Sequence, residues 1–386
     1  MMPSTRVLLQ LWIICQFYLH ARPEMSFDLQ LPDIRVFRSC NIEKIYQFGA
    51  SFSDTGNELV EDPTIASSRL PYGESSLQGP TGRYSDGLLM IDYIALAAGI
   101  PLLNPYLKDD ADFSHGVNFA VGGATALSAN GLAEKNIPVT AIDNSLGTQV
   151  EWMSNHFSSQ CHLDKDCSRG RLNNSLFVIG EIGRNDYNRA FGLGNKTFAE
   201  AEEMVPEVVE VVENAVRRVI GLGASQVIVP GIFPMGCLPG ILEDFKSNDK
   251  SAYDEHQCLK EFNNFVAFHN NYLQKTIITL QAENPHTTIV YADYFNAFKW
   301  ILYNAPRLGF DATSVLEGCC GNTGPTSDAS STEGCGSSNV PVCSNPDRYI
   351  NWDGVHFTQK THSVLATWVV ADMIPKLNCV LQVEDH

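Results

Sequence analysis

Five short apolar runs, without strict alternation of polar and apolar positions, constrain the fold of this chain more than any other feature. They are Lys44–Phe48, Gly116–Ala120, Leu176–Gly180, Gln226–Val229 and Thr288–Tyr291. A strand covered on one face alternates, whereas a strand of a parallel sheet is covered on both faces and stays apolar. The runs therefore predict five strands of one central, mainly parallel sheet.

Helical patterns stand between these predicted strands. In Pro206–Leu222, valine and isoleucine recur every three to four residues, with Pro206 in the expected first turn and Gly223 after the expected last turn. A second long helix is expected over Phe262–Leu280, before Asn284-Pro285. Strand, helix and strand in series require right-handed crossovers. The predicted fold class is α/β, a three-layer α/β/α sandwich.

The N-terminus differs from the rest of the chain. Met1 to Arg6 is basic, Val7 to Leu19 is mostly apolar, and the small residue Ala21 follows. This order is typical of a secretory signal peptide, and the apolar run is too short for a comfortable membrane span. A buried N-terminal helix is the alternative, which the basic start and the polar segment that follows disfavour. We expect residues 1–21 to be a signal peptide and residues 22–386 to form a single domain without an integral membrane segment.

The charge balance excludes some partners. Lys and Arg number 26 against 44 Asp and Glu, a formal net charge of −18. An acidic surface repels phosphate, so neither nucleic acid nor anionic lipid is an expected partner. Hydrophobic residues make up 44% of the chain, which is enough for a sizeable core and too much for a disordered protein.

The cysteines fit an oxidising compartment. Of 11 cysteines, Cys15 lies in the predicted signal peptide, which leaves an even number. Disulfides are therefore expected, and the close pairs Cys161/Cys167 and Cys237/Cys258 are natural guesses. A zinc site is the alternative, but the chain has no C-x-x-C and no histidine pair at ligand spacing beside these cysteines. No metal or organic cofactor is expected.

Two further patterns concern the surface. Asn173 and Asn195 stand in N-x-S/T sequons, which predict glycosylation because a signal peptide precedes them. Residues 317–347 are rich in Gly, Ser, Thr, Asn and Cys and show almost no apolar periodicity. We interpret this segment as a long disulfide-stapled loop within the domain.

Residues suited to chemistry follow the predicted strands, where sites form in parallel sheets. Ser51 follows the first strand, Gly122-Gly123 the second and Asn185 the third, while Asp353 and His356 lie near the C-terminus. Each has an ordinary structural alternative: a helix cap, a turn, a helix start, a turn carboxylate and a surface histidine. Together they supply a nucleophile, a base, a group that orients the base, and donors for an oxyanion.

Ordered blocks of the chain resemble a known family. FGASFSDTGN, GVNFAVGGAT, GRND and WDGVH are similar to the blocks of the plant GDSL esterase/lipases, members of the SGNH hydrolase superfamily. TGRYSDG (residues 81–87), residues 258–273 and the spacing of Cys319, Cys320, Cys335 and Cys343 extend the resemblance from about residue 42 to the C-terminus. The resemblance implies an SGNH, flavodoxin-like sandwich.

The resemblance also implies a role for each site residue. Ser51 would attack an ester carbonyl to give an acyl-enzyme, His356 would accept its proton, and Asp353 would orient the imidazole. The backbone N–H groups of Ser51 and Gly123 and the side-chain amide of Asn185 would form the oxyanion hole.

The chain departs from the family pattern at two positions. Ala50 replaces the usual aspartate of the GDS block, so a local hydrogen-bond network is expected to be lost. Arg184 replaces a common glycine, and we expect its side chain to point to solvent rather than to close the pocket or bind a carboxylate. Asp54 and Asp186 are expected to orient loops rather than to react.

The resemblance thus implies a secreted serine esterase acting on small-molecule esters, such as acetylated alkaloids or phenolic acyl esters, in the apoplast or a vacuole. An acyltransferase would use the same Ser51 acyl-enzyme but pass the acyl group to an alcohol. A non-catalytic binding protein is the third alternative, which the presence of Ser51, Asp353 and His356 disfavours.

Overall fold

The computed structural model describes residues 34–139, 143–163, 172–321, 323–324, 334–377 and 379. The chain divides into two compact units, Met1–Gln30 and Leu31–His386, and every element below belongs to the second. The predicted signal peptide, residues 1–21, lies outside the described residues.

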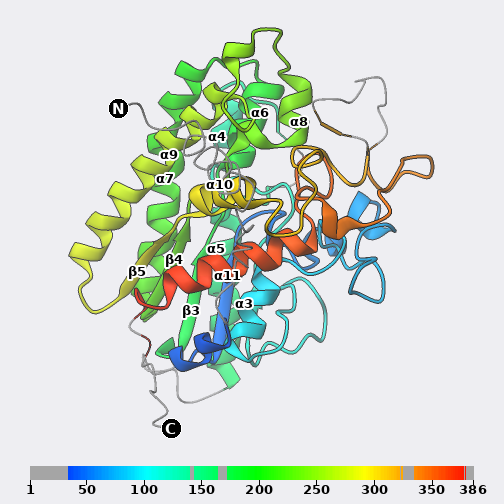
Figure 1. The fold of residues 1–386 in the computed structure, drawn as a ribbon. Helices are drawn as coiled ribbons and strands as arrows, with labels where there is room; N and C mark the ends of the chain where they lie inside the picture. The colour runs from blue at the N-terminus through cyan, green and yellow to red at the C-terminus, as the bar shows by residue number, and fades with distance from the viewer. Residues whose placement is uncertain are drawn as a thin grey trace, which may run out of the picture. The chain divides into compact units, whose positions relative to one another are not determined.

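The sheet has the five predicted strands. They are β1 (Lys44–Phe48), β2 (Gly116–Asn118), β3 (Ser175–Ile179), β4 (Gln226–Pro230) and β5 (Thr288–Ala292). All neighbours pair in parallel, in the order β2-β1-β3-β4-β5. Figure 1 labels β3, β4 and β5, which lie side by side. The predicted α/β class and the parallel sheet are therefore confirmed, with strand ends within two residues of the prediction. Parallel pairing brings the carboxyl ends of all five strands to the same edge.

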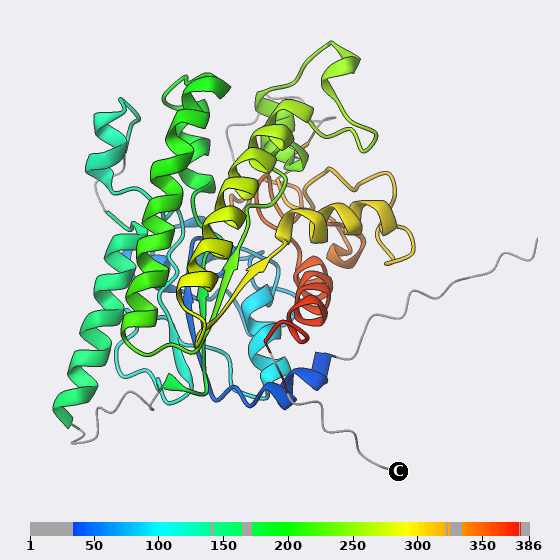
Figure 2. The same cartoon turned by 90° about the vertical axis from the view of Figure 1, so that its left-hand side faces the viewer.

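Helices cover both faces of the sheet, as Figure 2 shows. Three long helices pack beside one another on one face: α5 (Leu146–Leu163), α7 (Phe198–Gly221) and α9 (Lys260–Glu283). The other face carries α3 (Met90–Ala98) and α11 (Gln359–Met373), which pack on each other and on a 3₁₀ helix at Ile34–Cys40. Shorter helices lie in the connections: α2 (Asn57–Glu61), α4 (Ala129–Glu134), α6 (Arg184–Gly192), α8 (Pro239–Asp244) and α10 (Tyr294–Asn304).

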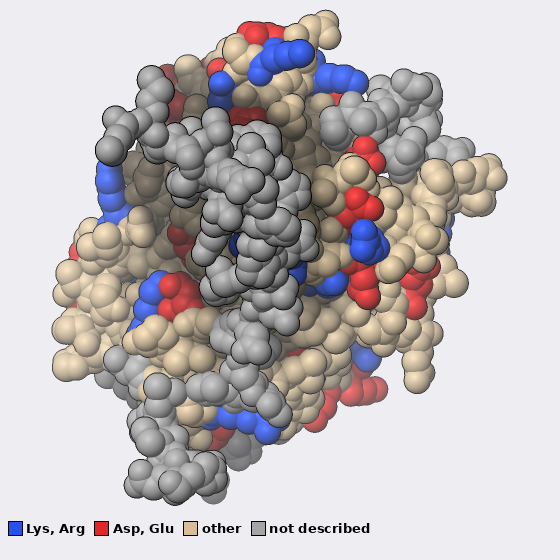
Figure 3. Space-filling model, in the orientation of Figure 1, with Lys and Arg blue, Asp and Glu red and all other residues tan. Residues whose placement is uncertain are grey.

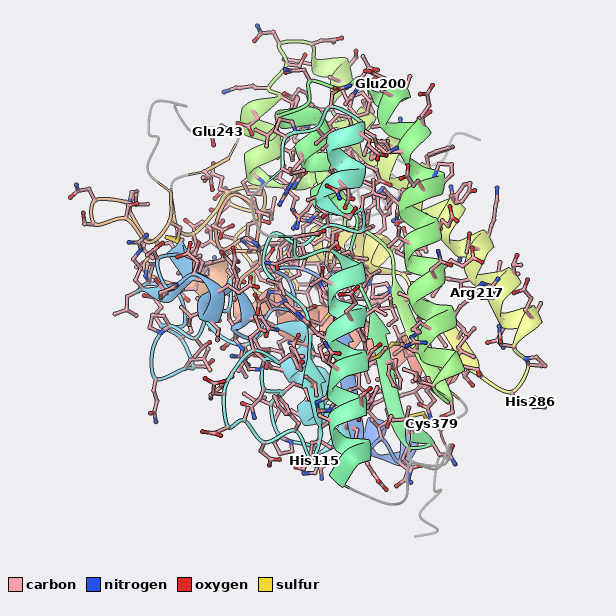
Figure 4. All side chains as sticks on the ribbon, turned by 180° about the vertical axis from the view of Figure 1, so that it is seen from behind. His115, Glu200, Arg217, Glu243, His286 and Cys379 are labelled. Atoms are coloured by element: carbon pink, nitrogen blue, oxygen red, sulfur yellow. A yellow bond between two sulfur atoms is a disulfide. The ribbon has the colours of Figure 1, made fainter. Side chains whose placement is uncertain are left out.

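Helix α7 begins earlier than predicted, so the placement of Pro206 in its first turn is wrong. The Thr197 side chain accepts from the Glu200 backbone N–H, and Glu200 accepts from the Thr197 backbone N–H, which is a reciprocal cap. Figure 4 shows Glu200 at the N-terminal end of α7 and Arg217 further along it. Pro206 lies inside the helix on its exposed side, where solvent can satisfy the freed carbonyl.

Aromatic side chains of the strands fill the main core. Tyr46 of β1 stacks on Phe177 of β3, with ring centroids 4.8 Å apart, and Phe48 packs against Phe119 at 5.1 Å. All four side chains are almost fully buried. Apolar burial of this kind is the dominant favourable contribution to folding, which explains why the strand sequences lack polar alternation.

The described residues contain four disulfides: Cys40–Cys379, Cys237–Cys258, Cys319–Cys343 and Cys320–Cys335. The predicted Cys237/Cys258 pair is confirmed, and the Cys161/Cys167 pair lies outside the described side chains. Two of these disulfides, Cys319–Cys343 and Cys320–Cys335, cross-link residues within the predicted stapled loop, residues 317–347. Together with Tyr72 and Trp352, their cysteines form a small second cluster separate from the main core.

The surface is mixed in charge on the face that Figure 3 shows, where Lys and Arg lie singly or in small groups beside Asp and Glu. Within the described ranges, no helix has both the length and the apolar character needed to cross a membrane. Both predicted glycosylation sites, Asn173 and Asn195, are exposed.

Candidate active site

The turn that carries Ser51 follows β1 directly. The backbone N–H groups of Ser53 and Asp54 donate to the Ala50 carbonyl and close this turn. Before it, Gly49 has a φ of +146°, and a Cβ there would lie 3.0 Å from the Gly180 carbonyl oxygen. The side chain of Gln149 binds both the N–H and the carbonyl of Gly49, at 2.9 and 2.8 Å. Ser51 is thereby fixed at the carboxyl edge of the sheet.

Ser51, His356 and Asp353 form one hydrogen-bonded relay. His356 Nε2 lies 2.8 Å from Ser51 Oγ, and His356 Nδ1 lies 2.9 Å from Asp353 Oδ2. Each of the three residues is more than 90% buried. A serine bound to a buried histidine, which is bound in turn to a carboxylate, is the arrangement that activates a hydroxyl for nucleophilic attack.

The carboxylate of Asp353 is held in its charged form. Burial raises its pKa, but the opposite charge and the ring N–H of His356, with the backbone N–H groups of His356 and Val355, outweigh burial and lower the pKa to about 2. Both backbone N–H groups donate to Oδ1 at 2.7 Å. Near neutral pH, Asp353 therefore accepts a hydrogen bond from the imidazole.

Two aspartates tie the neighbouring loops together, as expected for Asp54 and Asp186. Asp54 accepts from the backbone N–H groups of Gly56, Asn57, Glu58 and Gly122, so it links the serine turn to the glycine turn after β2. Asp186 accepts from the N–H groups of Ala126 and Leu127 further along that loop. Burial raises the pKa of both carboxyls, against these hydrogen bonds.

The three candidate oxyanion donors lie on these linked loops. The side-chain amide of Asn185, in the first turn of α6, donates to the Ala124 carbonyl at 2.8 Å and so rests against the Gly123 turn. Among the described residues, the backbone N–H groups of Ser51 and Gly123 have no hydrogen-bond acceptor. Gly123 itself has a φ of +73°, a conformation that glycine adopts without strain.

The prediction that Arg184 points to solvent is wrong. Its side chain is only 2% exposed, with Nε 3.6 Å from Oε1 of the equally buried Glu181. Its Cζ lies 4.7 Å from the ring centroid of Phe52, the neighbour of Ser51. Burial lowers the pKa of Arg184, and the charge of Glu181 raises it. A buried partner and an aromatic face together explain why this arginine leaves solvent.

Two tyrosines that sequence reasoning missed touch the relay. The Tyr72 hydroxyl donates to Asp353 Oδ2 at 2.9 Å. The Tyr84 ring stacks on the His356 imidazole, with centroids 4.6 Å apart, and its hydroxyl donates to Glu58 Oε2 at 2.9 Å. Tyr84 lies in the TGRYSDG block, whose resemblance to the family could have marked it as a site residue. Nothing in the sequence around Tyr72 indicates a contact with a residue 281 positions away.

A cavity of about 310 Å³ opens beside the glycine turn. Gly122, Gly123 and Ala124 line one side. The rest of the lining includes one cationic side chain, Arg189, and four acidic ones: Glu58, Glu61, Asp62 and Asp143. Burial raises the pKa of Glu58 to about 7, partly offset by the Tyr84 hydrogen bond. Within the described ranges, no three His, Cys, Asp or Glu side chains form a group that could hold a metal ion.

Comparison with known proteins agrees with this geometry. The family model described as GDSL-like Lipase/Acylhydrolase matches residues 45–369. Acetylajmalan esterase 1 of Rauvolfia serpentina is 45% identical over 343 residues, which cover 88% of this chain and 89% of the relative. A GDSL esterase/lipase of Arabidopsis thaliana is 36% identical over 90% of this chain and 95% of the relative. The chain therefore belongs to the GDSL family of lipases and acylhydrolases, and it is a carboxylic-ester hydrolase of that type.

Proposed function

We propose that this protein hydrolyses acetyl esters of basic alcohols, such as acetylated alkaloids, through an acyl-enzyme at Ser51. The observation that carries the mechanism is the buried relay, with His356 Nε2 2.8 Å from Ser51 Oγ and Nδ1 2.9 Å from Asp353. Two-step acyl transfer needs this combination of a nucleophile, a base and a group that orients the base.

The reaction proceeds in two balanced steps. Ser51 Oγ attacks the ester carbonyl while His356 Nε2 takes its proton and returns it to the departing alcohol. His356 then takes a proton from water, whose oxygen attacks the acyl-enzyme, and gives that proton to Ser51 Oγ as the acid is released. The N–H groups of Ser51 and Gly123 and the Asn185 amide donate to the oxyanion, each such donor contributing about 3 kcal/mol.

The acidic cavity supports the basic alcohol. It adjoins Gly123, so an ester held by the oxyanion donors extends into it. The four carboxylates there outnumber the single guanidinium of Arg189 and attract a protonated amine, whereas a phenolic ester brings no positive charge to meet them. Relatives named acetylajmalan esterases, at 45% identity, point to an acetyl group as the acyl part.

The mechanism is tested by labelling the purified protein with a fluorophosphonate probe, mapping the modified peptide and comparing Ser51→Ala. We expect a covalent adduct on Ser51 and no ester turnover by Ser51→Ala, with an unchanged melting temperature. Turnover by Ser51→Ala equal to that of the wild type would overturn the mechanism. Adding an alcohol acceptor to the assay separates hydrolysis from acyl transfer, because only a transferase gives mostly the new ester.

The substrate charge is tested with acetylcholine and its uncharged carbon isostere, dimethylbutyl acetate. We expect the ratio of kcat/KM on the charged to the neutral ester to rise as pH increases through about 7, where Glu58 ionises. In Glu58→Gln this ratio should fall about tenfold, which is the loss of about 1.4 kcal/mol, and should no longer depend on pH in that range. An unchanged ratio in Glu58→Gln would remove the cationic substrate class while leaving the esterase intact.

We also propose that the protein enters the secretory pathway, to the apoplast or a vacuole. The four disulfides among the described residues and two exposed sequons, Asn173 and Asn195, support an oxidising compartment. Sequencing the N-terminus of the protein exported from plant cells tests this, and we expect a new terminus after Ala21. A mature protein that retains Met1 and carries no glycan would contradict it.

A further inference from the structure

We propose that Tyr72 and Tyr84 are positioning residues for the relay, one holding the Asp353 carboxylate and the other the His356 ring. The inference rests on the proposed function, because holding Asp353 and His356 in place matters for activity only if Ser51 is the nucleophile. Neither tyrosine is a triad member or an oxyanion donor, and the two rings meet edge to face with centroids 5.9 Å apart.

Tyr72 completes the set of donors around Asp353. The two backbone N–H groups of Val355 and His356 bind Oδ1, and the Tyr72 hydroxyl binds Oδ2, the oxygen nearer to His356 Nδ1. A carboxylate with donors on both oxygens cannot rotate about its bond to Cβ without losing one of them. Tyr72 therefore fixes the direction from which Asp353 accepts the imidazole N–H.

Tyr72 is itself held rigidly. Its side chain is 3% exposed and packs in the second cluster with Cys320, Cys335 and Trp352. The Trp352 ring meets it edge to face at 5.9 Å, and a Cβ on Gly336 would lie 3.6 Å from its ring. Burial and the neighbouring Asp353 carboxylate raise the pKa of Tyr72 far above its usual value, so the hydroxyl remains a donor throughout the pH range in which proteins are folded.

Tyr84 holds the imidazole from its face. The two rings lie 4.6 Å apart and are inclined by 26°, close to parallel. The hydroxyl of Tyr84 is anchored on Glu58, so the ring is fixed at both ends of its length. When His356 takes the Ser51 proton, the imidazolium lies over an aromatic face, which attracts a cation. The stacked ring thus limits tilting of His356 and favours its charged form.

The experiment compares Tyr72→Phe and Tyr84→Leu with Tyr187→Phe as the matched control. Tyr187 is fully buried and its hydroxyl lies 2.8 Å from His269 Nδ1, so its loss also removes one buried hydrogen bond, but from a different histidine. Measurements are kcat and KM separately, the pH profile of kcat/KM, and the rate of labelling by a fluorophosphonate.

We expect Tyr72→Phe to lower kcat and the labelling rate about tenfold, with KM changed by less than about twofold. The acid limb of the kcat/KM profile of Tyr72→Phe should shift to higher pH, because a carboxylate with one donor fewer attracts the imidazolium more strongly. The other titratable groups near the pair, namely Arg184, His362 and Glu58, are unchanged in this variant. Tyr84→Leu should lower kcat similarly but shift the acid limb of this profile to lower pH, since it removes the aromatic face that attracts the imidazolium and leaves the donors of Asp353 unchanged.

Wild-type kcat and pH profile in Tyr72→Phe, or an equal loss in Tyr187→Phe, would overturn the positioning role. Should Tyr72→Phe not fold, the half-buried Tyr84 variant decides, and an unchanged kcat there overturns the inference. If the wild type neither hydrolyses esters nor labels at Ser51, the proposed function has failed instead. The NMR signal of the His356 Nδ1 proton then tests positioning alone: it should move or broaden in Tyr72→Phe and stay unchanged in Tyr187→Phe.

Discussion

The two halves of the candidate active site are supported by different kinds of structure. Ser51 follows β1 closely, where the parallel sheet and the main aromatic core fix the backbone. Asp353 and His356 stand in an irregular segment between the stapled loop and α11. Its polar support comes from the second cluster and from single hydrogen bonds, although the neighbouring Phe357 packs in the main core. A nucleophile placed by a sheet shares the stability of the whole fold, whereas an acid–base pair placed by a small cluster depends on a few local contacts.

Particular contacts show how local this support is. The backbone N–H groups of Cys319 and Cys320 donate to the carbonyls of Asn351 and Trp352 at 3.0 and 2.7 Å. The Trp352 N–H donates to the His356 carbonyl at 2.7 Å and closes the turn that contains Asp353. The described part of the stapled loop is thus directly attached to the segment it supports.

The largest effect should follow from changing one carboxylate oxygen in the second half. In Asp353→Asn, one carboxylate oxygen becomes an NH2 group, which donates to the imidazole and favours its wrong tautomer. We therefore expect kcat to fall about 10,000-fold. The melting temperature should fall by only a few degrees, since the shape is conserved and the charged carboxylate contributes on the order of 2 kcal/mol. Steady-state kinetics with thermal unfolding measure both. A fall of less than about tenfold would show that Asp353 does not orient His356.

The main core should show the reverse pattern. Phe177→Ala removes a fully buried ring that stacks on Tyr46, so the free energy of unfolding should fall by about 3–5 kcal/mol. Activity per folded molecule should remain near the wild-type value, because the space that the missing Phe177 ring leaves lies in the core beside the sheet and not at the site. Urea unfolding and active-site titration give the two numbers. A loss of kcat as large as the loss of stability would mean that the two halves are not separately supported.

Removing one staple should affect activity and stability together. Replacing Cys320 and Cys335 by alanine opens a loop with a sequence separation of 15, worth about 3 kcal/mol. Because these cysteines pack against Tyr72 and Trp352, kcat should also fall, unlike in Phe177→Ala. The same change at Cys237 and Cys258, a bridge outside the second cluster, is the matched control and should lower stability alone.

The smallest expected effect is a loss of stability in acid. The pKa of Asp353 is lowered from 3.8 to about 2 in the folded protein, so the unfolded chain binds the proton more tightly. The contribution, on the order of 2 kcal/mol, is complete above about pH 4 and is lost as the pH falls towards 2. Comparing the pH dependence of unfolding for the wild type and Asp353→Asn isolates it. Identical slopes would contradict the lowered pKa.

The sheet and the site residues that follow its strands could be predicted from the sequence because their signals are local. Each strand is a continuous apolar run, and Ser51, Gly123 and Asn185 each follow such a run. The start of α7 could also have been found, since Thr197 and Glu200 stand at the spacing of a reciprocal cap. The helical periodicity alone led to the wrong first turn at Pro206.

Contacts between distant segments could not be predicted in this way. Arg184 carries a charge, which favours exposure to solvent, but inside the fold its side chain packs against Glu181 and the Phe52 ring. The Tyr72–Asp353 bond and the Cys40–Cys379 disulfide join residues 281 and 339 positions apart. No local pattern reports such pairings, because they depend on how separate elements pack.

The Cys40–Cys379 disulfide also determines how the fold responds to mechanical load. It joins the 3₁₀ helix before β1 to a residue beyond α11, and Figure 4 shows Cys379 beside that N-terminal helix. A pulling force applied to the chain before Cys40 and after Cys379 passes through the covalent bridge and leaves the sheet between them without tension. Single-molecule stretching should therefore leave the strands intact until a reductant cuts the bridge, and the sheet should yield only then.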